Sequence, residues 1–366
     1  MESGCTRASA EKAMRFKSGI SGRSDSREVV KMSKKLLIAT LGTAPAVITE
    51  AIELLEEQSL HPDGVVLLYT EDYDVLSSLE LLMKHLPAHC EISWIVPISV
   101  GTYHDIDSTK AAVEFMQIAC TQLRTYRNNH RLFVSIAGGR KVMSALLALA
   151  VQFYGAECLF HIWVPPWLEE EGEIGQLRGL QPEQINARLH PPLVNRDPKD
   201  RPQLVDLPFI ALFPMLPDIR EALAGGTPID KNVKSMLVST GLLTTDGTPT
   251  PLGESVAAIL NLVEALPPAR QIEPKVHISS HHYKDRIEGF AKELIGYAPF
   301  VVEVRGEQWG QGEPGVSAQQ PRDLIVRARL GTDIRFQLRL VTTATTEGEL
   351  EAARRHVERY VQRKER

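Results

Sequence analysis

The chain has 366 residues, of which 43% are hydrophobic and 24% charged, so it is long enough for two or three folded domains. Its formal net charge of −5 argues against a protein that coats nucleic acid or an anionic membrane with its whole surface, but leaves room for a local basic face. No apolar run reaches transmembrane length, so we expect a soluble, cytoplasmic protein with no membrane partner.

The first 31 residues are rich in Ser, Arg and Lys and lack the apolar stretch of a secretory signal. We predict that residues 1–31 form a disordered extension. The four cysteines stand far apart in sequence, which favours reduced thiols over disulfides or a metal site; they are Cys5, Cys90, Cys120 and Cys158.

Residues 32–167 alternate between apolar runs and segments with helical spacing. Five buried strands are predicted in the runs KKLLIATLG, DGVVLLYTED, EISWIVPIS, RLFVSIAGG and CLFHIWVP. A helix is predicted after each of the first four. This alternation predicts an α/β fold, a doubly wound parallel Rossmann-like sheet with helices on both faces.

The strand and helix alternation does not continue beyond residue 167. Residues 168–217, rich in Glu, Gly and Pro, are predicted to be a linker or excursion with a short strand pair. Residues 218–266 have the layout of a small winged-helix module, with a wing turn at Asp246–Gly247. Residues 272–366 are predicted to form a C-terminal α+β domain of strand, helix, strand, a loose segment, a hairpin and a closing helix.

Two glycine turns close strands of the predicted parallel sheet. Gly42–Thr43 follows the first strand, and Gly138, Gly139, Arg140 and Lys141 follow the fourth. Each turn leads into a helix N-terminus, where backbone N–H groups and the helix dipole favour an anion such as phosphate. Neither turn matches a dinucleotide or P-loop fingerprint, which disfavours a nicotinamide cofactor or ATP. The alternative is that the glycines only form tight turns and that the cations are solvated.

The two segments LLIATLGTAPAVITEAIELL and SIAGGRKVMSALLALAVQFYGAECLFHIWV, with PISVGTYHDIDSTKAAVEFM between them, resemble the CRISPR-associated Rossmann-fold (CARF) sensors of type III systems. The resemblance covers roughly residues 34–165. It implies a homodimer in antiviral defence that binds a cyclic oligoadenylate, usually the tetramer, as an activator, with no other cofactor and no metal. The ligand-binding residues that it implies are Gly42, Thr43, Ala44, Thr70, Gly138, Gly139, Arg140 and Lys141.

The hairpin DLIVRARL-GTD-IRFQLRLV carries four arginines on the face opposite its apolar side chains; they are Arg327, Arg329, Arg335 and Arg339. Because like charges facing one another across strands are destabilising, this concentration suggests an anionic partner, most simply RNA. The alternative is a solvated face on which other elements supply carboxylates.

A second cluster, SSHHYKDR, ends the first strand of the C-terminal domain and contains His281, His282, Tyr283 and Lys284. A histidine can take the proton of a ribose 2′-hydroxyl while Lys or Arg stabilises the phosphorane, so we expect metal-independent RNA cleavage by these four residues and the four arginines. The order of elements resembles RelE-type messenger-RNA interferases over about residues 275–366, except that one helix stands where those proteins often have two.

We therefore expect an allosteric effector in which a cyclic oligoadenylate, bound by the sensor, activates a ribonuclease that cleaves RNA, with ribosome-associated messenger RNA as the expected target. Two alternatives stay open. One is a CARF and winged-helix transcriptional regulator, although the predicted recognition helix carries only Lys231 and Lys234 as cations. The other is a ring nuclease that degrades the cyclic oligoadenylate.

Overall fold

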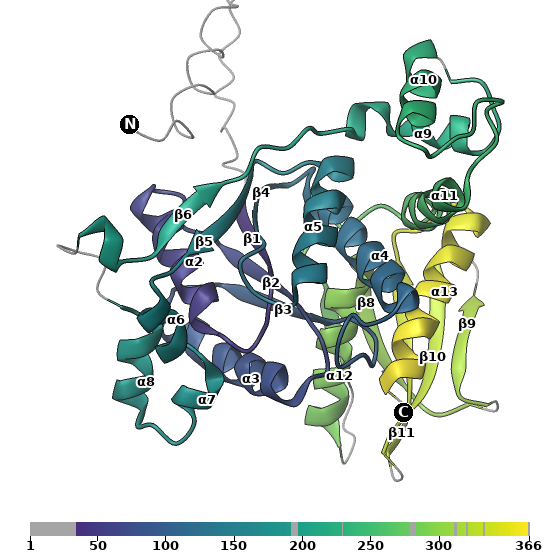
Figure 1. The fold of residues 1–366 in the computed structure, drawn as a ribbon. Coiled ribbons are helices and arrows are strands. Elements are labelled where there is room, and N and C mark those ends of the chain that lie inside the picture. Colours follow the sequence, from purple (N-terminus) through teal and green to yellow (C-terminus); the bar gives the residue numbers. More distant parts are fainter. Residues whose placement is uncertain are drawn as a thin grey trace, which may run out of the picture. The chain divides into compact units, whose positions relative to one another are not determined.

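A computed structural model describes residues 34–191, 197–228, 230–278, 283–310, 313–319, 321–331 and 334–364 (Figure 1). The predicted disordered extension at residues 1–31 and Cys5 lie outside this set. The other three cysteines are buried free thiols. None of the helices in the described part of the chain combines the length and apolar character needed to cross a lipid bilayer.

The first sheet has six strands in the order β3-β2-β1-β4-β5-β6. They are β1 (Lys34–Thr40), β2 (Gly64–Tyr69), β3 (Trp94–Ser99), β4 (His130–Ser135), β5 (Cys158–Trp163) and β6 (Gln203–Asp206). The first five pair in parallel, and β6 joins β5 antiparallel. The predicted mixed α/β fold with a parallel-rich sheet is confirmed.

Helices cover both faces of this sheet, as the near-continuous apolar strands require. They are α2 (Ala46–Glu57), α3 (Tyr73–His89), α4 (Thr109–Tyr126) and α5 (Lys141–Tyr154). Helices α2 and α3 pack on one face, and α4 and α5 pack on the other. Strand order reverses between β1 and β4, which is where ligands bind in open sheets of this kind.

The stretch predicted as a linker contains regular structure. It includes α6 (Pro166–Glu171), α7 (Ile174–Leu177), α8 (Pro182–Leu189), the 3₁₀ turns η1 (Pro198–Asp200) and η2 (Phe213–Met215), and strand β6. Its spaced leucines and Ile174 are buried, which supplies the apolar contact that a free linker would lack; they are Leu168, Ile174, Leu177 and Leu189. We call residues 166–190 the α6–α8 lobe.

Three helices link the two sheets along the sequence. They are α9 (Leu216–Leu223), α10 (Lys231–Ser239) and α11 (Pro251–Glu264). The predicted wing turn corresponds to a single antiparallel bridge, Leu243 to Pro249, between α10 and α11. Helix α11 packs against α4, where Arg124 forms an ion pair with Glu264 at 3.3 Å.

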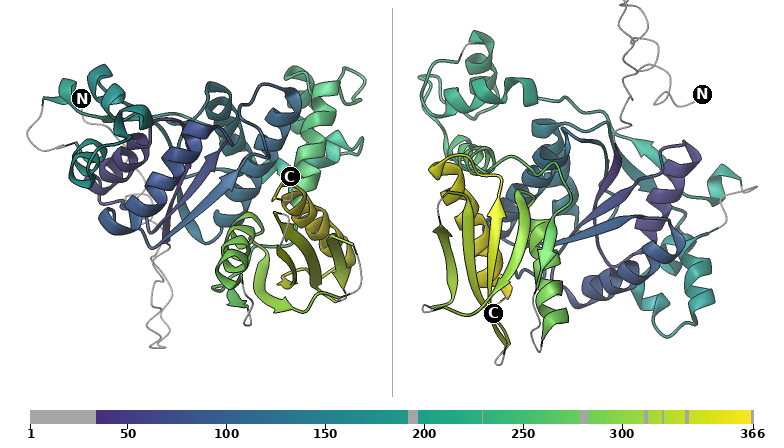
Figure 2. Two further views of the ribbon diagram at one scale, coloured as in Figure 1. Left: turned by 90° about the horizontal axis from the view of Figure 1, so that it is seen from below. Right: turned by 180° about the vertical axis from the view of Figure 1, so that it is seen from behind.

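The second sheet has the order β7-β8-β11-β10-β9. Its strands are β7 (Lys275–His277), β8 (Val301–Glu307), β9 (Gly315–Gln319), β10 (Asp323–Leu330) and β11 (Ile334–Thr342). Helices α12 (Lys284–Tyr297) and α13 (Glu347–Lys364) lie on one face of it (Figure 2). The predicted hairpin is β10 and β11, whereas part of the predicted loose segment forms β9.

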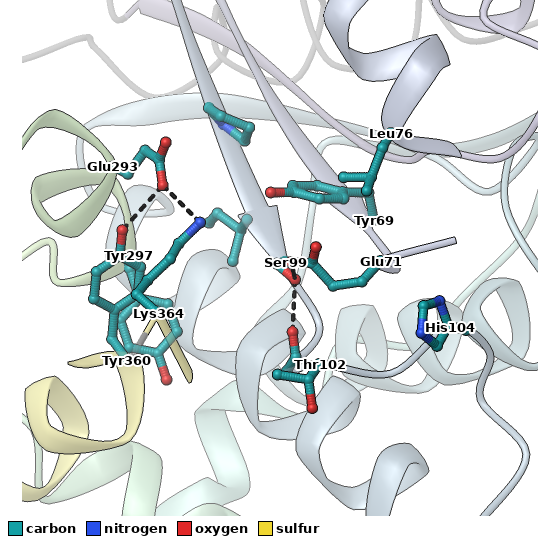
Figure 3. A pocket seen from close by; sticks show the side chains of 13 residues that line it. Tyr69, Glu71, Leu76, Ser99, Thr102, His104, Glu293, Tyr297, Tyr360 and Lys364 are labelled. Atoms are coloured by element: carbon teal, nitrogen blue, oxygen red, sulfur yellow. Dashed lines mark hydrogen bonds and ion pairs between the residues drawn. The ribbon is translucent and has the colours of Figure 1, made fainter. Parts of the chain in front are cut away.

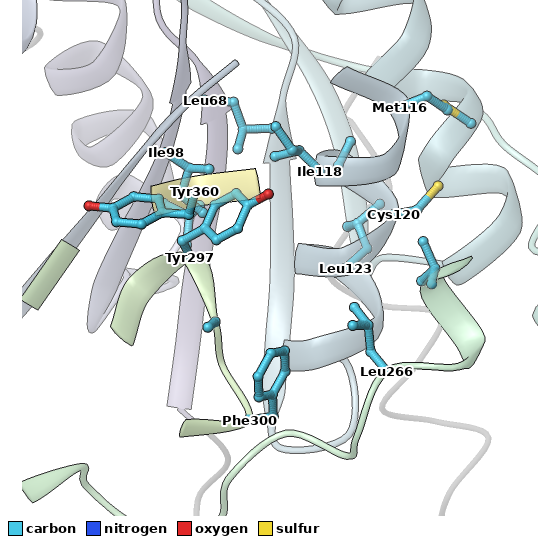
Figure 4. Close-up of a cluster of buried hydrophobic side chains, with 14 of the residues drawn as sticks. Leu68, Ile98, Met116, Ile118, Cys120, Leu123, Leu266, Tyr297, Phe300 and Tyr360 are labelled. Carbon is cyan, nitrogen blue, oxygen red and sulfur yellow. The ribbon is translucent and has the colours of Figure 1, made fainter. Parts of the chain in front are cut away.

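One apolar core joins the two sheets. Leu68 and Ile98 from the first sheet and Leu123 from α4 share a cluster with Phe300, which precedes β8, and Tyr360 of α13 (Figure 4). At the closest approach, a Cβ on Gly296 would lie 2.5 Å from a methyl group of Val96 on the edge strand β3. The C-terminal helices therefore pack directly on the sheet that carries the glycine turns.

Glu50 of α2, the helix on the other face of the first sheet, supplies a pH test of the packing there. Its side chain is 1% exposed, and burial, followed by the nearby charge of Glu53, raises its pKa from 4.5 to about 8. In the folded protein this carboxyl stays protonated up to about pH 8, whereas in the unfolded chain it ionises near pH 4.5. The folded state therefore has its full stability below pH 4.5 and loses stability as the pH rises through about 8. In urea unfolding, the free energy of unfolding of Glu50→Gln should exceed that of the wild type by on the order of 2–4 kcal/mol at high pH. At pH 5 the difference should be far smaller. The exposed Glu183→Gln is the control, and an equal gain at both pH values for Glu50→Gln would contradict this assignment.

Candidate functional site

The two glycine turns touch one another at the carboxyl edge of the first sheet. Strands β1 and β4 are neighbours, and a Cβ on Gly42 would lie 2.8 Å from the backbone nitrogen of Gly139. A Cβ on Gly138 would lie 2.3 Å from the carbonyl oxygen of Thr40. Gly139 has φ of +77°, a conformation that other residues adopt only with strain. These glycines are needed for backbone contact, beyond what a tight turn alone requires.

A helix begins directly after each turn. Helix α2 begins at Ala46 after Pro45, and α5 begins at Lys141 after Arg140; neither preceding side chain caps its helix. Because Arg140 makes no capping hydrogen bond, its side chain leaves the first backbone N–H groups of α5 available to another acceptor. With the dipole of a 14-residue helix behind them, they favour an anion at this edge.

The two cations of the second turn differ in their surroundings. Lys141 is exposed, and no ion pair holds it within the described part of the chain. Arg140 is shared between two carboxylates, with Nη2 3.7 Å from Asp72 and Nε 3.4 Å from Asp105. Lys141 is thus available to an incoming anion, whereas Arg140 is already partly neutralised.

The other sequence-predicted binding residues lie around the same edge. Thr43 and Ala44 are half-buried in the first turn, and the Thr43 carbonyl accepts a hydrogen bond of 2.7 Å from Ile174. Thr70 follows β2 but is only 1% exposed, so its side chain offers a ligand little surface in this conformation. The structure therefore brings the glycines, Thr43, Arg140 and Lys141 together and leaves Thr70 beneath them.

The α6–α8 lobe forms a wall beside the first turn that sequence reasoning missed. A Cβ on Gly172 would lie 2.6 Å from the Cβ of Ala46, and the Thr49 hydroxyl donates to the carbonyl of Leu189. His190, at the end of the lobe, bonds Glu53 of α2 through Nδ1, and its Nε2 lies 2.7 Å from Nε2 of His85. The buried leucine spacing noted above was the available signal for it.

The predicted catalytic residues of the C-terminal domain are divided between two places. His281 and His282 lie outside the described residues. Tyr283 and Lys284 stand at the start of α12, where Lys284 pairs with Glu288 at 3.5 Å. Helix α12 packs on the apolar face through Phe290 and Phe336, whereas the arginines occupy the opposite face. Tyr283 and Lys284 therefore begin a helix that packs on the face opposite the arginines.

Carboxylates offset part of the arginine face. Arg339 pairs with Glu307 and, at 3.1 Å, with Asp323. Burial disfavours the charge of Glu307, yet hydrogen bonds from Arg339 and Gln337 hold its pKa below the ordinary value. Arg327 donates to Gln337 at 2.9 Å. Around Arg339 the face therefore matches the alternative interpretation, in which carboxylates offset the charge: Glu307 comes from β8 and Asp323 from the hairpin itself.

Arg335 stands at the far end of the hairpin, beside its turn. Arg335 is exposed and lies directly opposite Arg329 in the antiparallel register. No ion pair holds Arg335 within the described residues. Of the four arginines, this one offers the least neutralised charge to an anionic partner.

A cavity of about 430 Å³ lies between the first sheet and the C-terminal helices (Figure 3). Tyr69, Glu71 and Ser99 line it from the ends of β2 and β3. Glu293, Tyr360 and Lys364 line it from α12 and α13, and Glu293 accepts hydrogen bonds from both Tyr360 and Lys364. Among the described residues, no group of His, Cys, Asp and Glu is arranged to hold a metal ion.

The family model of CRISPR-associated protein NE0113 matches residues 44–242, which is more than half of the chain. The chain belongs to this CRISPR-associated family. The matched region begins directly after the first glycine turn, contains the second, and includes the α6–α8 lobe and α10. It ends before the second sheet, so membership of the family says nothing about the C-terminal domain.

Other comparisons add little. Among solved structures, that of Enterococcus italicus Csm6 bound to cyclic hexa-2'-fluoro-hexa-dAMP is similar at 15% identity and a TM-score of 0.35. The similarity covers 63% of this chain and 55% of the Csm6 chain, so this chain spans only about half of that protein. At this TM-score the likeness supports no argument. No characterised protein with a curated description matches the sequence significantly.

The contact between the glycine turns predicts a specific loss of stability. Gly138→Ala forces a Cβ against the Thr40 carbonyl and should lower the free energy of unfolding by about 2 kcal/mol or more. Gly289 of α12 is the matched control position. Apart from the backbone of its own helix, no atom lies within 4 Å of where a Cβ on this residue would be. Gly289→Ala should raise stability by about 0.5–1 kcal/mol. Denaturant unfolding measures both, and a Gly138→Ala protein as stable as the wild type would contradict the close contact.

Proposed function

We propose that this member of the CRISPR-associated family is a CARF-type sensor of a type III system. It binds a cyclic oligoadenylate, with cyclic tetra-adenylate as the expected ring, at the two glycine turns. The main support is the contact between the Gly42 and Gly139 backbones beside the uncapped start of α5. Lys141, exposed there, has no ion pair among the described residues. Membership of a CRISPR-associated family supports the proposal independently.

The turns suit one phosphodiester edge of such a ring. A phosphate oxygen can accept from the first N–H groups of α5 while Lys141 supplies charge from the side. A ring of repeating nucleotides presents the same edge more than once, which suits a two-fold homodimer that presents the same site twice.

Helix α5 offers a surface on which a second copy could pack. Val142 and Leu149 are 43% and 47% exposed, and Ala145 lies exposed between them at helical spacing. These side chains form an apolar stripe that begins beside Lys141. A partner copy covering the stripe would bring its own second turn near this one, which is the arrangement that the proposal needs.

For the C-terminal domain we propose a metal-independent, RelE-like ribonuclease, controlled by the sensor, that acts on ribosome-associated messenger RNA. In this reaction a ribose 2′-oxygen attacks the adjacent phosphorus as a base takes its proton. The bond to the 5′-oxygen breaks, and that oxygen takes up a proton, which leaves a 2′,3′-cyclic phosphate and a 5′-hydroxyl. Arg335, exposed and unpaired within the described residues, suits the charge of the phosphorane. Tyr283 and Lys284 would have to approach from the edge of the sheet, since they begin a helix on the opposite face.

Lys141→Ala tests the sensor. Removing a charge-assisted hydrogen bond to phosphate should weaken the affinity for cyclic tetra-adenylate by about 10- to 100-fold in isothermal titration calorimetry. Lys84→Ala, an exposed lysine of α3 paired with Glu80, should leave it unchanged. The sensor proposal fails if the wild-type protein binds none of cyclic tri-, tetra- or hexa-adenylate, or if both variants bind like the wild type.

Arg335→Ala tests the effector. In the presence of cyclic tetra-adenylate it should lower the rate of RNA cleavage by about 100-fold, since it removes a donor to the developing charge. Arg355→Ala, an arginine of α13 paired with Glu351, is the matched control. Cleavage of RNA, with and without ribosomes, is followed by primer extension. Unchanged cleavage by Arg335→Ala would rule out this face as the catalytic surface.

A further inference from the structure

Arg140 connects three segments at the edge of the first sheet. It follows β4, whereas its two partners follow β2 and β3: Asp72 at 3.7 Å and Asp105 at 3.4 Å. Both carboxylates are also held by backbone N–H groups, Asp72 by Asp74 at 2.9 Å and Asp105 by Ile106 at 2.7 Å. Arg140 therefore bridges the ends of β2 and β4 to the loop between β3 and α4, residues 100–108, which we call the β3–α4 loop.

The β3–α4 loop and the strand end before it are hydrogen-bonded to the end of β2. The backbone N–H of Glu71 donates to Tyr103 at 2.8 Å, and that of Val100 donates to Tyr69 at the same distance. The Ser99 hydroxyl donates to the Glu71 carboxylate at 2.6 Å. These bonds hold Gly101 and Thr102 in a turn beside the end of β2, a few residues before Asp105.

Helix α13 lies across from this loop. Thr102 lines the 430 Å³ cavity, whose opposite wall includes Tyr360 and Lys364 (Figure 3). Gly101 and Thr102 also line a second cavity of about 200 Å³, whose wall includes Arg359. A close-packed contact would resist displacement, whereas these cavities leave the loop room to move toward the helix. Helix α13 in turn packs on β9 and β10, and β10 carries Arg327 and Arg329.

We propose that the β3–α4 loop transmits anion binding from Arg140 to α13, with Asp72 and Asp105 as the groups that oppose the anion. This inference rests on the proposed function. An anion at the start of α5 attracts Arg140 away from the two carboxylates. The carboxylates, then close to a like charge, are repelled, and the loop shifts against α13. The same two carboxylates weaken ligand binding, which is the cost of the coupling.

Hydrogen exchange of the full-length protein without ligand tests the mechanical part. Arg140→Ala releases the loop in the absence of any anion, so exchange should become several-fold faster in residues 100–108 and in α13. Arg131→Ala is the matched control, because this half-exposed arginine lies on β4 at the other end of the strand and pairs with Glu157. Exchange in α13 that is the same in Arg140→Ala and the wild type would overturn the proposal, whatever the ligand proves to be.

Titration of Asp105→Asn with cyclic tetra-adenylate tests the electrostatic part. Losing the opposing carboxylate should tighten binding by about two- to fivefold, the worth of an exposed ion pair, and should reduce the ligand-induced change of exchange in α13. Weaker binding would mean that Asp105 only positions Arg140, and would overturn the proposal while leaving the proposed function intact. If wild-type protein binds none of cyclic tri-, tetra- and hexa-adenylate, the proposed function and this inference both fail.

Discussion

The backbone contact between Gly42 and the Gly138–Gly139 turn is the constraint on which the rest of the account depends. Parallel pairing of β1 with β4 brings the two strand ends side by side, and only glycine lets the chains approach as closely as they do. That approach places the start of α5, Arg140 and Lys141 at one point of the edge, where the strand order reverses. Without it the same residues would be scattered surface groups.

Charge compensation separates the cations whose charge is already partly neutralised by carboxylates from those with no ion pair among the described residues. Arg140 and Arg339 each face two carboxylates, whereas Lys141 and Arg335 have no ion pair among the described residues. Sequence spacing does not distinguish Arg140 from Lys141, which share a turn, or Arg335 from Arg339, which share a face. Carboxylates from distant elements make the difference, and these are visible only in three dimensions.

The sheet that carries the candidate site could be predicted from the sequence because its signals are local. Apolar runs ending in glycine and followed by helical spacing predicted β1 and β4 and the start of α5. The α6–α8 lobe was missed because its helices are short and its buried leucines are separated by Glu and Gly. Strand β9 was missed because GVSAQ carries little apolar alternation, and pairing with β10 supplies the order. The divided placement of Tyr283 and the arginines depends on which face α12 covers, which no spacing reveals.

A crystal structure of the full-length protein with cyclic tetra-adenylate tests the central claim most directly. The account predicts the ring across a two-fold axis between two copies, with a phosphate within hydrogen-bonding distance of Lys141 and of the first backbone N–H groups of α5. A ring bound elsewhere, such as on the arginine face of the second sheet or in the cavity beside α13, would contradict it.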